Sequence, residues 1–284
     1  MGLNSWLIDK AAHWLNQVTE PNPHHVPLTD FERLSEELRQ GDVLLVEGLS
    51  RVSQIIKSIT FSPWTHSVLY IGRLGEINDG QLKNKIAEFY NGDLHQQLIV
   101  EAVLGEGTVI HPVSKYKNEH LRICRPRGIS KTDRQQVIAY ALSHLGYEYD
   151  IRHLLDLARF LLPYSIIPRR WRSTLFTQYA GQQTKNVCSY MLGEAFASVD
   201  FPVLPVAERS DNGDFKLYRR NPRLLTPKDF DYSPYFDIIK YPYLGLDEVA
   251  AYRSLPWNSE GAISDKTGEY RIPDKFSNKE NNKI

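Results

Sequence analysis

Residues 64–72 read Trp-Thr-His-Ser-Val-Leu-Tyr-Ile-Gly, a short apolar run rich in β-branched and aromatic side chains. The run predicts a β-strand because Pro63 precedes it and Gly72 closes it, and both residues favour turns. His66 stands at the start of this strand. It is therefore expected at an end of the sheet, where polar side chains can be brought together from several elements.

Four similar runs lie on either side of this strand along the chain. They are GDVLLVEG (41–48), LIVEAV (98–103), GTVIHPV (107–113) and HLRICRP (120–126). The runs are short and separated by turn residues, so they predict about five strands in an antiparallel sheet.

The spacing of apolar residues becomes helical after residue 130. One helix is expected to begin at Ser130 or Thr132 and end at Gly146, a second to cover about 151–162, and a third to begin near Cys188. Strands grouped before helices predict an α+β fold, with the sheet packed against the helices.

The bulk composition excludes several classes of protein. Lysine plus arginine and aspartate plus glutamate number 34 each, so the net charge gives no sign of a nucleic-acid binder. Two cysteines cannot make a disulfide scaffold. No secretory signal is visible, and no run approaches the roughly 18 apolar residues of a membrane span. A cytoplasmic location is the expectation.

An amphipathic helix is predicted over residues 3–19, with Trp6 and Trp14 on its apolar face. Such a helix either docks on its own domain or makes peripheral contact with a membrane surface. A proline-containing linker follows. A short helix is then expected over 29–39, with Thr29 as its N-cap.

Three residues suggest nucleophilic chemistry. Cys188 opens a helix in the segment NVCSYMLGEAF, and a helix N-terminus together with an imidazole lowers the pKa of a thiol. His66 is the candidate base. Glu101 lies inside an otherwise apolar strand, where a carboxylate needs a partner, and the ring N–H of His66 would supply one. Taken singly, each residue also fits a structural role, as a buried thiol, a satisfied histidine or the partner of a core arginine.

The order of the segments that carry these residues is informative. GDVLL, WTHSVLYIG, VEAVLGEGTVIHPVSKY, LGYEYD and VCSYMLGEAF follow one another along the chain. In combination they resemble the circularly permuted papain-like amidases of the YaeF/YiiX type, within the superfamily of NlpC-type peptidases and lecithin:retinol acyltransferase-like enzymes. The resemblance covers about residues 40–200. It implies a permuted papain-like fold, with His66, Glu101 and Cys188 as the catalytic triad and a thioester intermediate.

This resemblance also suggests how the chain is organised. A region of N-terminal helices and linker (1–39) would precede a papain-like catalytic domain (40–245) that holds an extra helical and basic segment at 151–185. The polar tail, 246–284, is expected to be disordered.

Each of three further candidate residues has two interpretations. Tyr149 either lines the cleft or is a packed tyrosine. Arg170 and Trp171, in the basic and aromatic segment 168–172, either bind an anionic group of the substrate or belong to a solvated loop. His111 is assigned a structural role. Metal-ligand spacings, a Walker loop and Gly-x-Ser-x-Gly are absent from the sequence, so no metal or cofactor is expected.

Three functions remain open at this point. The first is a cysteine hydrolase that cleaves an amide in a small, peptide-like substrate. The second keeps the triad but acts on lipid-like acyl groups, as a hydrolase or acyltransferase. The third is a catalytically inert binding protein with the same fold.

Overall fold

The computed structural model of the chain describes residues 10, 13–18, 27–77, 79–147, 188–209, 212–246, 250–257, 262–263 and 269–270. The chain divides into two compact units, Met1–Tyr243 and Leu244–Ile284. The second unit contains a short helix, η5 (Ala251–Ser254), and a pairing of β9 (Ala262–Ile263) with β10 (Glu269–Tyr270). The helix predicted over 151–162 lies outside the described residues, and the domain boundaries stay predictions.

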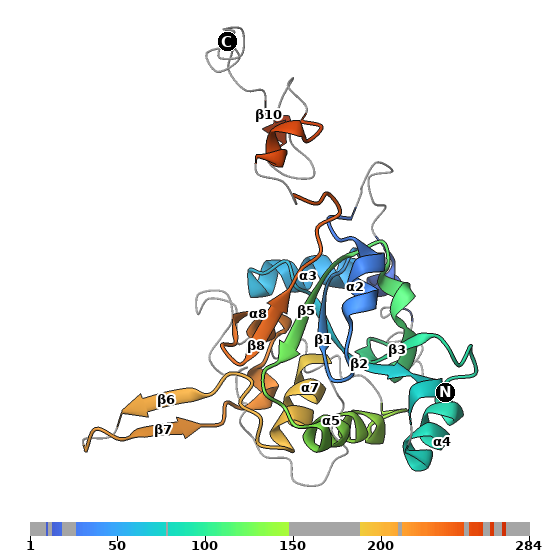
Figure 1. Cartoon of the computed structure of the whole chain (residues 1–284), viewed down its shortest axis with the longest axis vertical. Coiled ribbons are helices and arrows are strands. Elements are labelled where there is room, and N and C mark those ends of the chain that lie inside the picture. The colour runs from blue at the N-terminus through green and yellow to red at the C-terminus, as the bar shows by residue number, and fades with distance from the viewer. Residues whose placement is uncertain are drawn as a thin grey trace, which may run out of the picture. The chain divides into compact units, whose positions relative to one another are not determined.

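A six-stranded antiparallel sheet forms the centre of the first unit, in the order β4-β3-β2-β1-β5-β8 (Figure 1). Its strands are β1 (Val43–Glu47), β2 (His66–Arg73), β3 (Gln97–Val103), β4 (Gly107–Pro112), β5 (His120–Pro126) and β8 (Phe236–Ile239). The α+β class and the five predicted strands are confirmed. The sixth strand was missed because β8 is only four residues long and pairs with β5 from more than a hundred positions away.

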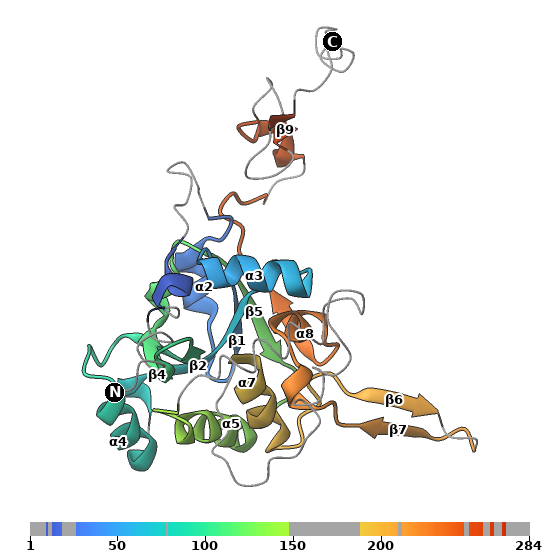
Figure 2. The same ribbon diagram turned by 180° about the vertical axis from the view of Figure 1, so that it is seen from behind.

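Helices cover both faces of the sheet. On one face α5 (Lys131–Ser143) and α7 (Cys188–Ala197) lie next to each other (Figures 1 and 2), and α4 (Gly80–Phe89) contacts α5. On the other face lie α2 (Phe31–Glu37) and η2 (Val113–Tyr116). The side chains of β1 alternate between the two faces of the sheet, so this strand contributes to the core on both sides. Leu45 packs with α5 and α7 on one face, and Leu44 packs with α2 on the other.

Two helices lie between the strands in segments for which no helix was predicted. They are α3 (Arg51–Thr60), capped by the Ser50 hydroxyl, and α4, capped by the Asp79 carboxylate. The predicted N-cap of α2 is also wrong. Asp30 accepts the cap hydrogen bond from the Arg33 N–H at 3.1 Å. The Thr29 hydroxyl is instead held by His120 and the backbone of Leu121.

The C-terminal part of the first unit anchors α7. Its elements are η4 (Pro222–Leu224), α8 (Pro227–Tyr232) and a hairpin of β6 (Val206–Arg209) and β7 (Phe215–Tyr218), which projects from this unit in both views (Figures 1 and 2). Phe196 of α7 contacts the rings of Phe201, Phe230 and Phe236. This aromatic cluster fixes the C-terminal half of α7, and therefore the direction in which its first residue points.

The described part of the N-terminal segment contacts the rest of the first unit. The Asn16 amide donates to the Leu104 carbonyl at 2.6 Å, and the Arg51 guanidinium lies 4.7 Å from the centre of the Trp14 ring. These contacts fit the docked alternative for residues 13–18, and membrane contact stays a prediction. Within the described ranges, no helix combines the length and apolar content needed to cross a bilayer.

Candidate active site

Glu101 is a fully buried carboxylate at the centre of a hydrogen-bond network. The side chain is 0% exposed in β3. It is bonded by His66 Nε2 at 2.6 Å, His111 Nδ1 at 2.8 Å and Lys115 Nζ at 2.8 Å, and the Tyr116 hydroxyl donates to the oxygen that His66 contacts. Burial raises the pKa of Glu101, but the bonds from His111 and His66 outweigh it and hold the pKa well below its usual range.

His66 bridges this carboxylate and the thiol of Cys188. Because Nε2 is bonded to Glu101, Nδ1 is the nitrogen left for Cys188. Burial lowers the pKa of His66, whereas Cys188 and Glu101 both raise it, and the net result is a pKa of about 10. At neutral pH the imidazole is therefore positively charged.

Cys188 is the first residue of α7 and is 5% exposed. Burial raises the pKa of its thiol, but the charge of His66 and a hydrogen bond from it, together with Ser67, lower the pKa below the ordinary value. A helix N-terminus also favours a thiolate. Cys124 is the reverse case, because burial in β5 raises its pKa well above the usual value. The pKa values of the two thiols are therefore shifted in opposite directions.

Sheet register and one hydrogen bond bring these three side chains together. His66 opens β2 and pairs with Val46 of β1, so its ring lies at the end of the ladder. Glu101 pairs with Val109 of β4, inside the sheet. The Ser189 hydroxyl donates to the Leu225 carbonyl at 2.7 Å and ties down the first turn of α7.

A cavity of about 360 Å³ opens beside the thiol. Its lining includes His66 and Cys188. The apolar residues of the lining come from β1, from α3 and the segment before it, from the end of β3 and from the β3–β4 turn: Val46, Leu49, Val52, Ile56, Ala102, Val103 and Leu104. Its polar side includes Lys115, Tyr116 and Glu119. The thiol, its base and an apolar wall therefore share one space, as a site for an acyl substrate requires.

The structure describes three of the six predicted site residues. It brings His66, Glu101 and Cys188 together, in the arrangement expected from the sequence, and their catalytic role stays a prediction. Tyr149, Arg170 and Trp171 lie outside the described residues, so their role in substrate binding stays a prediction too.

Several polar residues of the site were not found from the sequence. His111 was assigned a structural role, and Lys115, Tyr116 and Glu119 were not considered. Strand alternation could have indicated His111, because it lies two residues beyond Val109, the partner of Glu101. Finding the others requires the path of η2 and of the turn before β5, which the sequence pattern does not fix.

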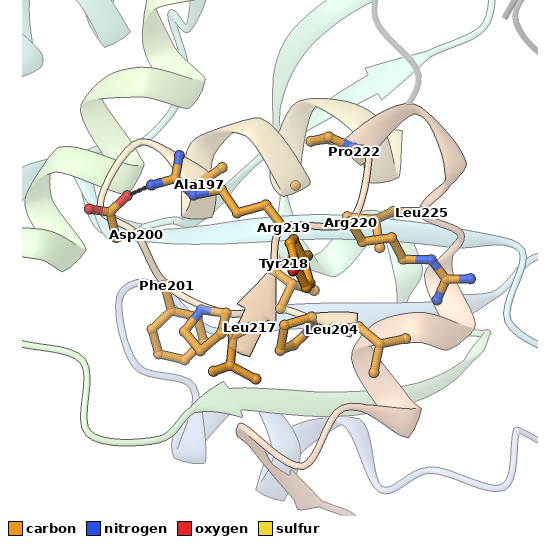
Figure 3. A pocket seen from close by; sticks show the side chains of 14 residues that line it. Ala197, Asp200, Phe201, Leu204, Leu217, Tyr218, Arg219, Arg220, Pro222 and Leu225 are labelled. Atoms are coloured by element: carbon orange, nitrogen blue, oxygen red, sulfur yellow. Dashed lines mark hydrogen bonds and ion pairs between the residues drawn. The ribbon is translucent and has the colours of Figure 1, made fainter. Parts of the chain in front are cut away.

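A second cavity, of about 250 Å³, lies at the other end of α7 (Figure 3). Apolar side chains such as Phe201, Leu204 and Leu217 line it, and Arg219 pairs with Asp200 at its edge. Among the described residues that line this cavity there is neither a cysteine nor a histidine, so they provide no thiol–imidazole pair. In the part of the chain that the structure describes, no group of three or more histidine, cysteine, aspartate and glutamate side chains is arranged to hold a metal ion.

Comparisons with known proteins bear on this assignment. A structure described as metalloprotein yiiX from Escherichia coli O157:H7 is similar at 12% identity and a TM-score of 0.42, over 72% of this chain and 97% of that one. No curated protein matches the chain. Residues 37–159 match the family described as permuted papain-like amidase enzyme, YaeF/YiiX, C92 family. That match confirms the resemblance to permuted papain-like amidases drawn from the sequence, over the stretch that carries His66 and Glu101.

Proposed function

We propose that this chain is a thiol hydrolase that cleaves an amide bond with Cys188 as nucleophile, His66 as acid and base, and Glu101 as the residue that orients His66. One observation carries the proposal: His66 lies between the thiol at the start of α7 and a buried carboxylate, with a raised pKa on the imidazole and a lowered pKa on the thiol. The match to an amidase family supports hydrolysis as the reaction class.

The geometry supports a reaction in two stages. The thiolate of Cys188 attacks the carbonyl carbon, and backbone N–H groups of the first turn of α7 stabilise the oxyanion. His66 then donates its proton to the departing amine, leaving a thioester on Cys188. In the second stage His66 takes a proton from water, the hydroxide attacks the thioester, and the acid departs as the thiolate is restored.

The network around Glu101 keeps His66 in the working orientation. Lys115 and His111 hold one carboxylate oxygen, while Tyr116 and His66 share the other. Burial and the charge of Glu101 raise the pKa of Tyr116 well above its usual value, so its hydroxyl stays a donor. The carboxylate therefore cannot rotate without breaking several bonds at once, and the imidazole keeps its Nδ1 toward the thiol.

A second candidate function, hydrolysis or transfer of lipid-like acyl groups, is favoured by the apolar wall of the cavity. Val52 and Ile56 of α3 and Val46 of β1 would suit a hydrocarbon chain.

We expect p-nitrophenyl acetate to acetylate Cys188 in a burst of one equivalent, because this activated ester acylates the thiolate faster than water releases the thioester. Mass spectrometry of the trapped protein locates the acetyl group. Cys188→Ser should abolish the burst, and His66→Ala should slow it by roughly a hundredfold or more. Cys124→Ala is the matched control and should keep the burst. Acetylation that persists in Cys188→Ser would contradict the proposal, and the absence of any burst in the parent protein would favour an inert binding protein.

Glu101→Gln should lower the pKa of His66 and raise that of the Cys188 thiol, since the amide cannot stabilise the imidazolium as a carboxylate does. Thiolate absorbance in the ultraviolet, followed against pH, measures the shift. Glu106→Gln is the control, because that half-exposed carboxylate lies 3.6 Å from His111 Nε2 and makes no ion pair with His66 in the described part of the chain. An unchanged titration of the Cys188 thiol in Glu101→Gln would show that Glu101 does not stabilise the ion pair between Cys188 and His66.

The two candidate functions differ in their response to acyl-chain length. If the cavity takes a small amide, kcat/KM for p-nitrophenyl esters should stay level or fall from acetate to dodecanoate. A rise along that series that Val52→Asp removes would establish the lipid-like function instead. Ile55→Asp, at an exposed position of the same helix outside the cavity lining, is the matched control.

A further inference from the structure

Glu119 lines the cavity beside Cys188, and one of its carboxylate oxygens finds no partner in the part of the chain that the structure describes. The residue lies in the turn between η2 and β5, where its N–H donates to the Tyr116 carbonyl at 3.0 Å. Its side chain lines the cavity. Its Oε2 is buried and has no hydrogen-bond partner among the described residues. Buried polar atoms are nearly always bonded, so this oxygen needs an explanation.

The cations around Glu119 are each bonded to another carboxylate. Lys115 donates to Glu101 at 2.8 Å, His66 contacts Glu101 at 2.6 Å, and Lys57 donates to Glu47 at 2.7 Å. These three cations and Glu101 are the charged groups that act most strongly on Glu119. Burial raises the pKa of Glu119 to about 7, and the cations offset burial only in part. The residues that the structure describes therefore leave one oxygen of this carboxyl group without a partner, and the group loses its proton near neutral pH.

We propose that Glu119 binds a cationic nitrogen of the substrate, so that the preferred substrates carry an ammonium group close to the scissile carbonyl as well as an apolar portion. An ammonium donates to a carboxylate in a charge-assisted hydrogen bond, and would give the buried oxygen the partner it lacks. The apolar residues of the same cavity lining would receive the uncharged part. A single carboxylate does not make a site for a metal ion, which needs several ligands. The inference rests on the proposed function, because it takes this cavity as the substrate site.

Alkylation of Cys188 tests the inference without a known substrate. The probes are chloroacetamides that carry an aminoethyl, aminopropyl or aminobutyl group, each matched with its hydroxyalkyl analogue. In every case the thiolate displaces chloride and forms a thioether, so the paired reagents differ in charge and not in chemistry. The rate ratio of amino to hydroxy reagent, corrected by the ratio for free cysteine, reports cation binding.

We expect at least one amino reagent to react about tenfold faster than its hydroxy partner, the factor that a charged hydrogen bond commonly provides. Glu119→Gln should bring that ratio close to the free-cysteine value. Glu106→Gln removes the second glutamate among the described residues of the cavity lining, and this variant should keep most of the amino-to-hydroxy rate ratio. The ratio should rise with pH through about 7 as Glu119 ionises, while changes in the thiolate affect both reagents equally.

The outcomes separate this inference from the proposed function. If all reagents alkylate Cys188 no faster than a free thiol, the proposed function fails. If Cys188 is reactive toward the neutral reagents but the ratio is near one, or the ratio survives in Glu119→Gln, the cationic substrate is wrong and the thiol hydrolase stands.

Protein stability gives a second readout of the same carboxyl group. Its pKa is raised from 4.5 to about 7, so the stability it contributes is present below pH 4.5 and is lost as the pH rises through about 7. Glu119→Gln should therefore raise Tm above pH 7 and have less effect near pH 4.5. A variant less stable than the parent above pH 7 would show that Glu119 already has a partner within the protein, and would contradict the inference.

Discussion

The burial of one carboxylate, Glu101, organises the site. A charge without access to water must be surrounded by donors, or folding becomes costly. The chain meets this demand from three neighbouring elements, with His66 from β2, His111 from β4 and the Lys115–Tyr116 pair from η2. The same requirement that stabilises the fold therefore orients the imidazole. A change in the register of β2, β3 or β4 would disturb the core and the base together.

The nucleophile reaches this network from a separate layer. α7 packs on the sheet through an apolar face that ends in the aromatic cluster around Phe196, and the Ser189 hydroxyl fixes its first turn to Leu225. Cys188 thus approaches His66 from a rigid helix end, and the helix N-terminus favours the thiolate that His66 also stabilises. The site combines a carboxylate fixed by the sheet with a thiol fixed by a helix, and His66 interacts with both.

Much of this arrangement could be predicted from the sequence, and the missing parts have physical causes. Alternating and continuous apolar runs indicated five strands, and a glutamate inside one of them indicated a buried partner. The helix α3 was missed although Val52, Ile55, Ile56 and Ile59 recur at helical spacing, so here the local pattern was present and was not used. Strand β8 and the residue Glu119 depend on contacts between distant parts of the chain, which no local pattern encodes. The contact of His111 with Glu101 was not predicted because it depends on how β3 pairs with β4.

The central claim is that Cys188 and His66 form an ion pair near neutral pH. The most direct test is the rate of Cys188 alkylation by iodoacetamide as a function of pH, in the parent protein and in His66→Ala. The account predicts a rate that reaches its plateau well below the ordinary thiol pKa of 9.0, and the loss of that plateau in the variant. A profile like that of free cysteine, unchanged by the substitution, would contradict the ion pair and with it the catalytic assignment.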